Sequence, residues 1–289
     1  EHRDWSLSLA QYVDGRGLSR AWAEEFVYPT LAANWGVSVS DVVDFPAYSV
    51  LKVLSRYRGA GHRFLELEGG VSSYVDRLVG RLNRVALRPG IGVSRLVHLD
   101  DGRVRVEDDR GGAATFDDVV LATSARDAAR MLAGVPRAAR WREVLGRFRH
   151  FDTTIAIHGD PSFMPARRED WSMINVFHER GRASWQTEGA GRGEGASVFR
   201  TWLRPDDPRP ERLHWLQSFH HLIVTPESEG LHRRIADLQG EAGLWAVGMY
   251  TTDVDNHESA LASAVLVARA LAARSRREAT NDWPASGAA

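Results

Sequence analysis

Cysteine is missing from this chain of 289 residues, which excludes disulfides, thiolate metal sites and cysteine nucleophiles. Lys52 is the only lysine in the sequence, and all the other residues among the 37 Lys and Arg are arginine. The net charge is -1, so no electrostatic attraction to nucleic acid or to an anionic membrane is expected. No apolar run reaches the about 18 residues of a membrane span, and no signal peptide is visible. These absences favour a protein of a reducing compartment, and we expect a cytoplasmic location.

Motifs of hydrolysis and of metal catalysis are also lacking. The eleven histidines include no His-x-x-x-His or His-Glu-x-x-His spacing, so we expect no metal site. No Gly-x-Ser-x-Gly elbow occurs, which argues against an esterase. A strand, Gly-x-Gly-x-x-Gly and helix unit is not found either. The nearest pattern, Gly191–Ala196, lacks a buried strand before it and precedes a strand-like run, so it predicts a flexible loop.

The first segment that is present, residues 5 to 60, carries aromatic and aliphatic residues at helical spacing. Ser38 is expected as an N-cap, and Pro46 is expected to break the pattern. Most tryptophans here are interpreted as core residues. Trp35 is the exception, because it is expected beside Gly36 in a loop between helices.

The second segment alternates strands and helices, which is typical of an α/β domain. A double glycine, Gly69 and Gly70, is expected to open a helix over 71–82, as a tight turn or a place of close ligand approach. Asp100-Asp101-Gly102 predicts a hairpin turn. The expected strands span 64–68, 85–87, 91–99, 104–106 and 119–123.

Residues 150 to 235 predict an antiparallel sheet with long loops, the usual form of a substrate domain. Beyond them, a short apolar strand over 244–247 meets Gly248, and a helix rich in small residues starts near His257. A glycine and a helix N-terminus let a backbone approach a ligand closely and offer unpaired N–H groups. The alternative is an ordinary strand-to-helix turn.

Four of these passages, in order, resemble the FAD-dependent amine oxidase and phytoene desaturase superfamily. They are most similar to a bacterial branch of NAD/FAD-binding oxidoreductases. The four passages are Phe64–Tyr74, Ile91–Val97, Phe116–Thr123 and the strand–glycine–helix passage over 243–265. His158–Pro165, with Trp171 and Asn175, is similar to a further passage of that branch.

The resemblance implies that FAD is the cofactor and places it beside residues of all four passages. These cofactor-binding candidates are Gly69, Gly70, Val93, Ala122, Thr123, Gly248, Met249, His257, Glu258, Ser259 and Ala260. Many relatives carry an acidic residue at the position of Met249 and glycine at that of Ser259, which weakens the transfer of contacts there. Glu258 stays open between capping its helix and binding a ribityl hydroxyl.

The resemblance also implies an N-terminal Gly-x-Gly-x-x-Gly unit of roughly one hundred residues, which this sequence lacks. We expect it to come from a missing N-terminal segment or from a split partner chain.

Substrate contacts are expected from four tryptophans and one amide, with sheet-core packing as the alternative. These residues are Trp35, Trp171, Asn175, Trp202 and Trp215. His220 and His221 are the candidates for proton transfer, because histidine titrates near neutral pH; surface or structural roles are the alternative. Many amine oxidases of the superfamily place a substrate-domain lysine near flavin N5. Lys52 lies in the N-terminal helical part, so that device is not expected.

These patterns predict an α/β protein, α+β overall. A partial FAD/NAD(P)-binding Rossmann-like domain is combined with a helical and antiparallel-sheet substrate domain. The expected parts are a helical piece of the substrate domain (1–62), a piece of the FAD-binding domain (63–135), the antiparallel-sheet piece (136–235), the C-terminal FAD-binding segment (236–274) and a flexible tail (275–289).

The sequence therefore predicts an FAD-dependent oxidoreductase. It would be an oxidase, desaturase or isomerase that acts on a small apolar organic substrate by hydride transfer to the flavin. The alternative is a non-catalytic subunit or pseudoenzyme that binds a partner chain or a small molecule. The missing phosphate-binding unit motivates that alternative.

Overall fold

The computed structural model describes residues 4–55, 67–172, 174–177, 182–186, 197–203, 207–252 and 256–281. The chain divides into two compact units, each made of two stretches of sequence. Glu1–Pro89 joins His150–Pro226 in the first unit, and Gly90–Arg149 joins Glu227–Ala289 in the second. Helices and both antiparallel and parallel strands are present, so the α/β class predicted from sequence is confirmed.

The N-terminal helices of the first unit are short and closed by local caps. They are α1 (Leu9–Gly15), α2 (Arg20–Trp22), a π-helical turn (Ala23–Val27), α3 (Tyr28–Trp35), α4 (Val39–Val42) and α5 (Ala47–Ser55). Ser38 forms a capping box with Asp41 at the start of α4, as its position in the sequence predicts. Gly36 ends α3 with a left-handed φ of 69°, the usual helix C-terminal glycine.

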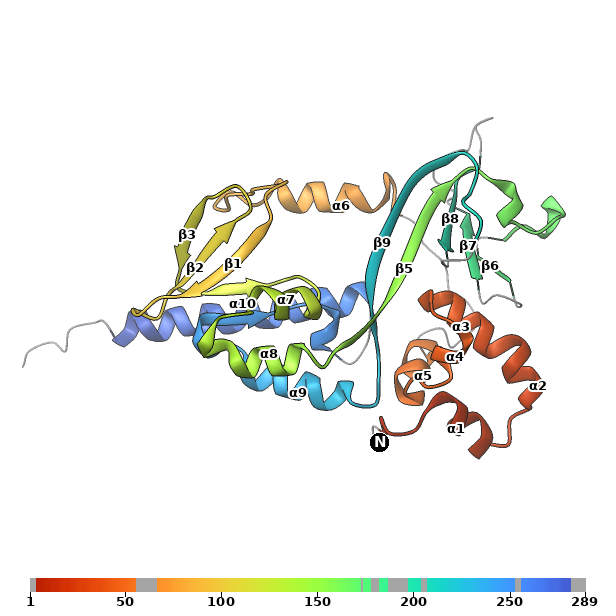
Figure 1. Ribbon diagram of the computed structural model, residues 1–289, viewed down its shortest axis with the longest axis horizontal. Helices are drawn as coiled ribbons and strands as arrows, with labels where there is room; N and C mark the ends of the chain where they lie inside the picture. Colours follow the sequence, from red (N-terminus) through yellow and green to blue (C-terminus); the bar gives the residue numbers. More distant parts are fainter. Residues whose placement is uncertain are drawn as a thin grey trace, which may run out of the picture. The chain divides into compact units, whose positions relative to one another are not determined.

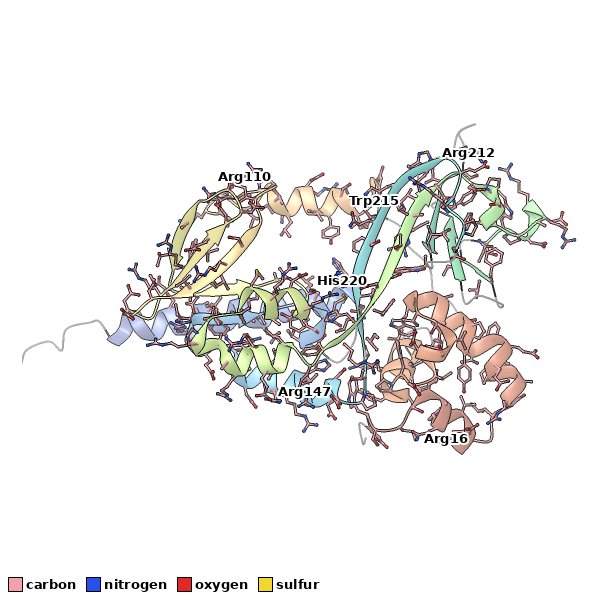
Figure 2. The ribbon with its side chains drawn as sticks, in the orientation of Figure 1. Arg16, Arg110, Arg147, Arg212, Trp215 and His220 are labelled. Carbon is pink, nitrogen blue, oxygen red and sulfur yellow. The ribbon has the colours of Figure 1, made fainter. Side chains whose placement is uncertain are left out.

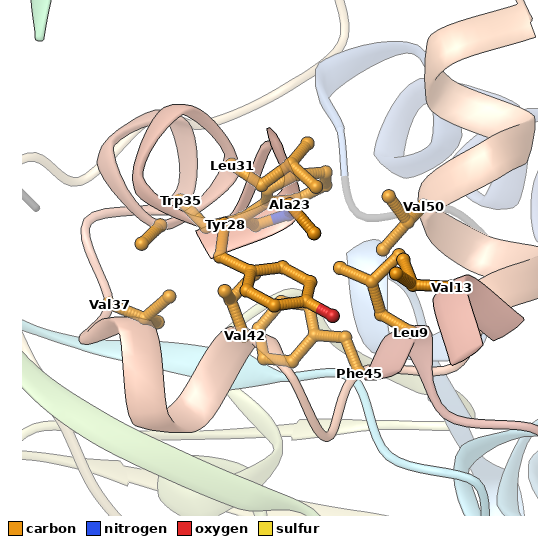
Figure 3. Packing of buried hydrophobic residues seen from close by; sticks show 11 residues of the cluster. Leu9, Val13, Ala23, Tyr28, Leu31, Trp35, Val37, Val42, Phe45 and Val50 are labelled. Carbon is orange, nitrogen blue, oxygen red and sulfur yellow. The ribbon is translucent and has the colours of Figure 1, made fainter. Parts of the chain in front are cut away.

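Burial of apolar side chains between these helices forms one hydrophobic cluster (Figure 3). Leu9, Val13, Leu31 and Val42 lie in it, and the aromatic rings of Trp35 and Phe45 meet edge to face at 5.9 Å. Small helices of this kind are marginal alone, so the cluster supplies their stability.

The rest of the first unit is a five-stranded sheet in the order β6-β7-β8-β5-β9 (Figure 1). Its strands are β5 (Arg149–His158), β6 (Ile174–Phe177), β7 (Arg182–Gln186), β8 (Phe199–Leu203) and β9 (Leu213–Ile223). β5 with β8, β6 with β7 and β7 with β8 pair antiparallel, as expected for this region. The first unit also holds α6 (Gly70–Val79).

The second unit combines a meander with a short parallel pair. β1 (Val93–His98), β2 (Val104–Asp108) and β3 (Ala113–Phe116) form an antiparallel sheet, with the predicted turn at Gly102 (φ 88°). β4 (Val119–Leu121) runs parallel to β10 (Leu244–Ala246), more than a hundred residues later. Residues 85–87, expected as a strand, have no regular structure. Of the expected strand 64–68, residues 64–66 lie outside the described residues, and residues 67 and 68 are not in a strand.

Four helices complete the second unit: α7 (Ala125–Met131), α8 (Ala139–Leu145), α9 (Ser228–Leu238) and α10 (His257–Asn281). Trp141, Leu132, Ile235 and Leu244 are fully buried and form its interior. Within the residues that the structure describes, no helix is both long and apolar enough to cross a membrane.

Candidate functional site

The second unit contains an open cavity of about 550 Å³ beside β4. Its walls come from β1, β2, β4 and α7, and most of them are apolar. The lining residues are Val93, Ser94, Leu96, Val106, Val119, Val120, Leu121, Ala122, Thr123, Asp127, Arg130 and Met131. Pockets for small ligands have this size and this mixture of an apolar wall with a few polar groups.

Three of the cofactor candidates, Val93, Ala122 and Thr123, meet at this cavity although they lie far apart in sequence. β4 ends at Leu121, so Ala122 and Thr123 follow its carboxyl end with exposed side chains. Ligands of open α/β sheets bind outside the carboxyl ends of parallel strands. Small residues at that position leave room for such a ligand.

The polar side of the cavity comes from α7 and was not predicted. The Arg130 guanidinium lies 3.0 Å from the Asp127 carboxylate, and Met131 lies on the same wall. Asp127 also donates its backbone N–H to the Ser124 hydroxyl (3.1 Å), which caps the helix. The spacing of 127, 130 and 131 places these residues on one helix face. That spacing, directly after a buried strand, is the signal that could have identified them.

The Gly248 loop has a backbone that only glycine adopts readily, with φ of 137°. A Cβ at this position would lie 3.2 Å from the Tyr250 ring. The loop is held from both sides, because Ser263 Oγ accepts the Gly248 N–H (2.9 Å) and Thr251 Oγ1 donates to the Gly248 carbonyl (2.8 Å). Met249, half-buried, starts a 3-10 turn (Met249–Thr251).

The start of α10 is capped by Asn256 and not by Glu258. Asn256 Oδ1 accepts both the backbone N–H and the hydroxyl of Ser259, each at 2.9 Å. His257 and Glu258 are exposed, Ser259 is buried and Ala260 is half-buried. Asn256 therefore supplies a side-chain cap, while Glu258 places its negative charge in the first turn of α10. None of these four residues, nor Gly248 or Met249, lines the cavity beside β4.

Gly69 and Gly70 belong to the first unit, where both have left-handed φ values of 79° and 74°. Gly70 begins α6, and Ser73 Oγ donates to its carbonyl (2.8 Å). The predicted double-glycine helix entrance is thus present. The described contacts here are local to the turn.

The expected substrate residues of the first unit are mostly engaged in packing. Trp35 is the last residue of α3, not a loop residue, and it is buried in the helical cluster. Asn175 is buried, donates to the Ser172 carbonyl (2.7 Å) and accepts the Ser172 N–H (3.0 Å). Trp171 donates to the Pro165 carbonyl (2.8 Å) and meets the Phe199 ring edge to face at 5.4 Å.

Trp202 and Trp215 differ from these three. Trp202 covers Gly36, and its indole nitrogen has no hydrogen-bond partner among the described residues. Trp215 lies exposed on β9, with the Phe219 ring centroid 6.0 Å from its own (Figure 2). Trp215 is therefore the expected pocket residue with the most open surface.

The two candidate histidines follow each other on β9 but have different surroundings. His220 Nδ1 contacts the Asp152 carboxylate on β5, and both side chains are well exposed (Figure 2). His221 Nδ1 contacts the Leu222 carbonyl oxygen (3.0 Å), and its ring packs 5.2 Å from that of Phe151. His220 combines an accessible ring with a carboxylate partner, the pairing that proton transfer uses.

His158 has a structural role in the first unit. Its ring is fully buried between Phe163 and Phe199. Nδ1 accepts the Asp160 N–H (3.1 Å), so the other ring nitrogen, 2.9 Å from Thr201 Oγ1, carries the proton in the neutral ring. Burial lowers the pKa of His158, so the ring stays neutral. The passage over 158–165 thus builds a corner of the fold.

Within the described ranges, no group of three or more His, Asp or Glu side chains is arranged to hold a metal ion.

Comparison with known proteins places the fold. No protein-family model matches the chain, and a search of curated proteins gives no match. Among solved structures, the CLA-producing fatty acid isomerase from P. acnes aligns with a TM-score of 0.64 at 16% identity, covering 93% of this chain and 67% of that one. An oxidoreductase from Methanosarcina mazei aligns with a TM-score of 0.56 at 15% identity, covering 90% and 67%.

Cyclohexylamine oxidase from Brevibacterium oxydans aligns with a TM-score of 0.57 at 12% identity, covering 93% of this chain and 68% of the oxidase. These alignments extend over both units. They show that the chain has the fold shared by these enzymes, and that about a third of each of these proteins has no counterpart in it.

Proposed function

We propose that this chain is the larger part of an FAD-dependent oxidoreductase that oxidises, desaturates or isomerises a small apolar organic substrate. The observation that carries the proposal is the meeting of Val93, Ala122 and Thr123 at one cavity beside the carboxyl end of β4. The fold neighbours support it, since they include an isomerase and an amine oxidase.

The residues around the cavity fit one end of a dinucleotide. Valine and methionine side chains offer a flat apolar wall for a base, and Arg130 and Thr123 offer donors for sugar and phosphate oxygens. A glycine-rich phosphate cradle is not in the sequence. We therefore assign the adenosine half of FAD to this cavity. When bound, FAD accepts a hydride at its flavin ring.

In this proposal the first unit supplies the substrate side. Trp215 and Phe219 present an open aromatic surface on β9, which suits an apolar substrate. His220, paired with Asp152, is the group that would hold or move a proton. The Lys52 side chain is assigned no part in the chemistry; it lies 5.7 Å from the Tyr48 ring centroid in the helical part.

The test is binding of FAD to the purified chain, followed by flavin fluorescence, with ADP and FMN as competitors. If the cavity takes the adenosine half, ADP displaces FAD and FMN does not. Ala122→Trp fills the cavity and should weaken FAD binding at least tenfold. Ala113→Trp, on exposed β3 outside the cavity, is the matched control and should bind as the wild type does.

Displacement of FAD by FMN, or equal loss in both tryptophan variants, would contradict this assignment of the cavity. A chain that takes up neither FAD nor ADP, even when a phosphate-binding unit is supplied, would favour the second candidate function. That candidate is a non-catalytic subunit. It is favoured by the burial of Trp35 and Asn175, which places two expected pocket residues in the interior of the first unit.

A further inference from the structure

The N-terminal helices of the first unit border a second open cavity, of about 410 Å³. Its walls come from α1, from α5 and from two residues that precede α1. This volume is within the range of about 300–1,000 Å³ in which proteins hold small ligands. The cavity shares no lining residue with the one beside β4, which belongs to the second unit. It therefore has no part in the function proposed above.

The walls of this second cavity are held together by the fold. The Ala47 N–H at the start of α5 donates to the Leu7 carbonyl (2.8 Å), which ties α5 to the segment before α1. The buried Trp5 ring lies 5.5 Å from the ring of Tyr48 and supports that side chain. Leu7, Ala47 and Leu51 supply the apolar part of the lining. The cavity is thus a built feature of the helical cluster with an apolar wall.

Two tyrosine rings line the cavity from different helices. Tyr12 belongs to α1 and Tyr48 to α5, and their rings do not contact each other within the described part of the chain. Each ring has a cation close to it. The Arg16 guanidinium lies 5.4 Å from the Tyr12 centroid, and the Lys52 ammonium lies 5.7 Å from the Tyr48 centroid. Because aromatic rings associate in offset or edge-to-face arrangements, this pair suits a flat aromatic ligand.

The polar part of the lining consists mainly of hydrogen-bond donors. Gln11 Oε1 accepts the Ser8 N–H (2.9 Å), so the amide N–H groups of Gln11 are turned away from Ser8. Those N–H groups, the hydroxyls of Tyr12 and Tyr48, and the Arg16 guanidinium have no acceptor among the residues that the structure describes. A ligand rich in acceptor oxygens satisfies such a set.

The charges around the cavity also favour an anion. Arg16, at the end of α1 (Figure 2), has no ion-pair partner in the described ranges, and Lys52 adds a second positive charge nearby. Asp4 is the acidic member of the described lining, and its Oδ1 already accepts the N–H (2.9 Å) and the hydroxyl (2.6 Å) of Ser6. Asp4 precedes α1 and Arg16 follows it, so a helix of about 10 Å separates the two charges. An anionic group therefore belongs at the Arg16 end.

We propose that this cavity binds a small aromatic carboxylate. The ring of the ligand lies between Tyr12 and Tyr48, against the apolar part of the lining. Its carboxylate accepts hydrogen bonds from the Arg16 guanidinium and the Gln11 amide. A planar guanidinium matches the two oxygens of a carboxylate, and one guanidinium balances its single charge. The site belongs to the first unit alone and requires neither FAD nor catalysis.

The probes are 2-naphthoate and its neutral counterpart 2-naphthamide, which has nearly the same shape. Equilibrium dialysis against the purified chain, without FAD, measures the affinity and the number of molecules bound. We expect one naphthoate per chain, bound at least tenfold more tightly than naphthamide. Backbone amide NMR should show the largest shifts in α1 and α5.

Gly15 allows the cavity to be filled without strain. It is the last residue of α1, its φ lies outside the left-handed region, and a Cβ there would meet nothing within 4 Å. Gly15→Leu therefore occupies the cavity and should weaken naphthoate binding at least tenfold. Gly230→Leu in α9 is the matched control, because a Cβ there also meets nothing and Gly230 does not line the cavity. This control should bind as the wild type does.

Arg16→Gln tests the recognition of charge. It should weaken naphthoate binding at least tenfold and leave naphthamide binding unchanged, a difference that a general effect on folding would not produce. Arg20→Gln is the matched control, because Arg20 is an exposed arginine near the acidic groups of Asp14 and Glu24 and does not line the cavity. If circular dichroism shows Gly15→Leu unfolded, the exposed Arg16 still provides the test.

Equal affinity for naphthoate and naphthamide would overturn the proposal. Naphthoate binding that Gly15→Leu leaves unchanged in a folded chain would also overturn it. If that binding is lost in Ala122→Trp instead, the ligand occupies the cavity beside β4, which contradicts the proposal as well. Conversely, a chain that binds naphthoate as expected and takes up no FAD would retract the proposed function alone.

Discussion

Tyr250 has a buried hydroxyl with no hydrogen-bond partner among the described residues. The residue is 4% exposed, and its ring meets that of Phe148 edge to face at 5.4 Å. Burial also raises the pKa of Tyr250 far above its ordinary value, so the group is neutral. A polar atom in this state costs stability until something satisfies it.

Tyr250→Phe should therefore leave the isolated chain as stable as the wild type or raise its free energy of unfolding by about 1 kcal/mol. Urea unfolding measures the difference. Tyr12→Phe, where the ring is half-exposed beneath Arg16, is the control and should change nothing measurable. A clear loss of stability in Tyr250→Phe would mean that the hydroxyl has a partner in the folded chain.

At this scale the sequence reveals residue type better than residue role. Trp35, Trp171 and Asn175 are recognisable as large or polar groups that need partners. Their partners, however, depend on how the nearby chain turns: Trp171 bonds to the Pro165 carbonyl six residues before it, and Asn175 bonds to the Ser172 backbone three residues before it. No spacing in the sequence identifies these partners. Val93, Ala122 and Thr123 could be singled out through the resemblance. Asp127 and Arg130 could be found only by asking which face of α7 follows β4.

At the scale of elements, Asp118 ties β4, β10 and α10 together within the second unit. Its Oδ1 accepts the Trp245 indole N–H and an Arg274 guanidinium N–H, both at 2.8 Å. Trp245 is 6% exposed, so its indole N–H depends on this carboxylate. The parallel pair is thus fastened next to the start of β4.

Asp118→Ala should lower the free energy of unfolding by about 1–3 kcal/mol, because it leaves a buried indole N–H unpaired. Asp118→Asn keeps an acceptor for Trp245 and should cost less, since the lost ion pair to Arg274 is partly exposed. Thermal unfolding by circular dichroism ranks the three proteins. Asp101→Ala, from an exposed pair with Arg103, should melt like the wild type. Equal melting of Asp118→Ala and wild type would contradict the role given to Asp118.

Most elements could be predicted because their signals are local. The capping box at Ser38, the turn at Gly102 and the glycine entrance of α6 depend on a few neighbouring residues. Residues 85–87 are an apolar run that reads as a strand, but they pair with no strand among the described residues and are irregular. The pairing of β4 with β10 links residues about 125 positions apart, counted from Val119 to Leu244, and no local signal encodes it.

At the scale of the whole molecule, a buried histidine makes the stability of the first unit depend on pH. His158, in the first unit, has an ordinary pKa of 6.5 that burial lowers; His214 lowers it further, and Asp160 opposes both. Below pH 6.5 the unfolded chain therefore binds a proton that the folded chain refuses. The stability contributed by the neutral ring is present above pH 6.5. It is lost as the pH falls toward the lowered pKa that His158 has in the folded chain.

Acidification from pH 7 to pH 5.5 should thus destabilise the first unit, with a slope of at most about 1.4 kcal/mol per pH unit from this group. Urea unfolding followed by hydrogen exchange resolves the two units. His158→Gln, which keeps a donor for Thr201, should flatten the pH dependence of the first unit. An unchanged slope in this variant would show that other groups control it.

The whole molecule also has apolar surface that its own described residues do not cover. Val71, Val75 and Leu78 of α6 are 64%, 41% and 56% exposed, although their spacing forms one helix face. Helical periodicity places these residues on one face and says nothing of what covers it. Large exposed apolar patches mark interaction surfaces. The α6 face is a patch of this kind.

Gly36 is also tied to a distant residue. A Cβ there would lie 2.7 Å from two carbon atoms of the Trp202 ring, and the φ of 69° already disfavours other residues. The helical cluster and the five-stranded sheet of the first unit therefore meet where the Trp202 ring packs against Gly36. Only the glycine hydrogen fits in the space that a side chain would otherwise need. Any natural variant of this protein that kept Trp202 would have to keep glycine at position 36. Position 36 should therefore change in evolution only where position 202 has changed as well.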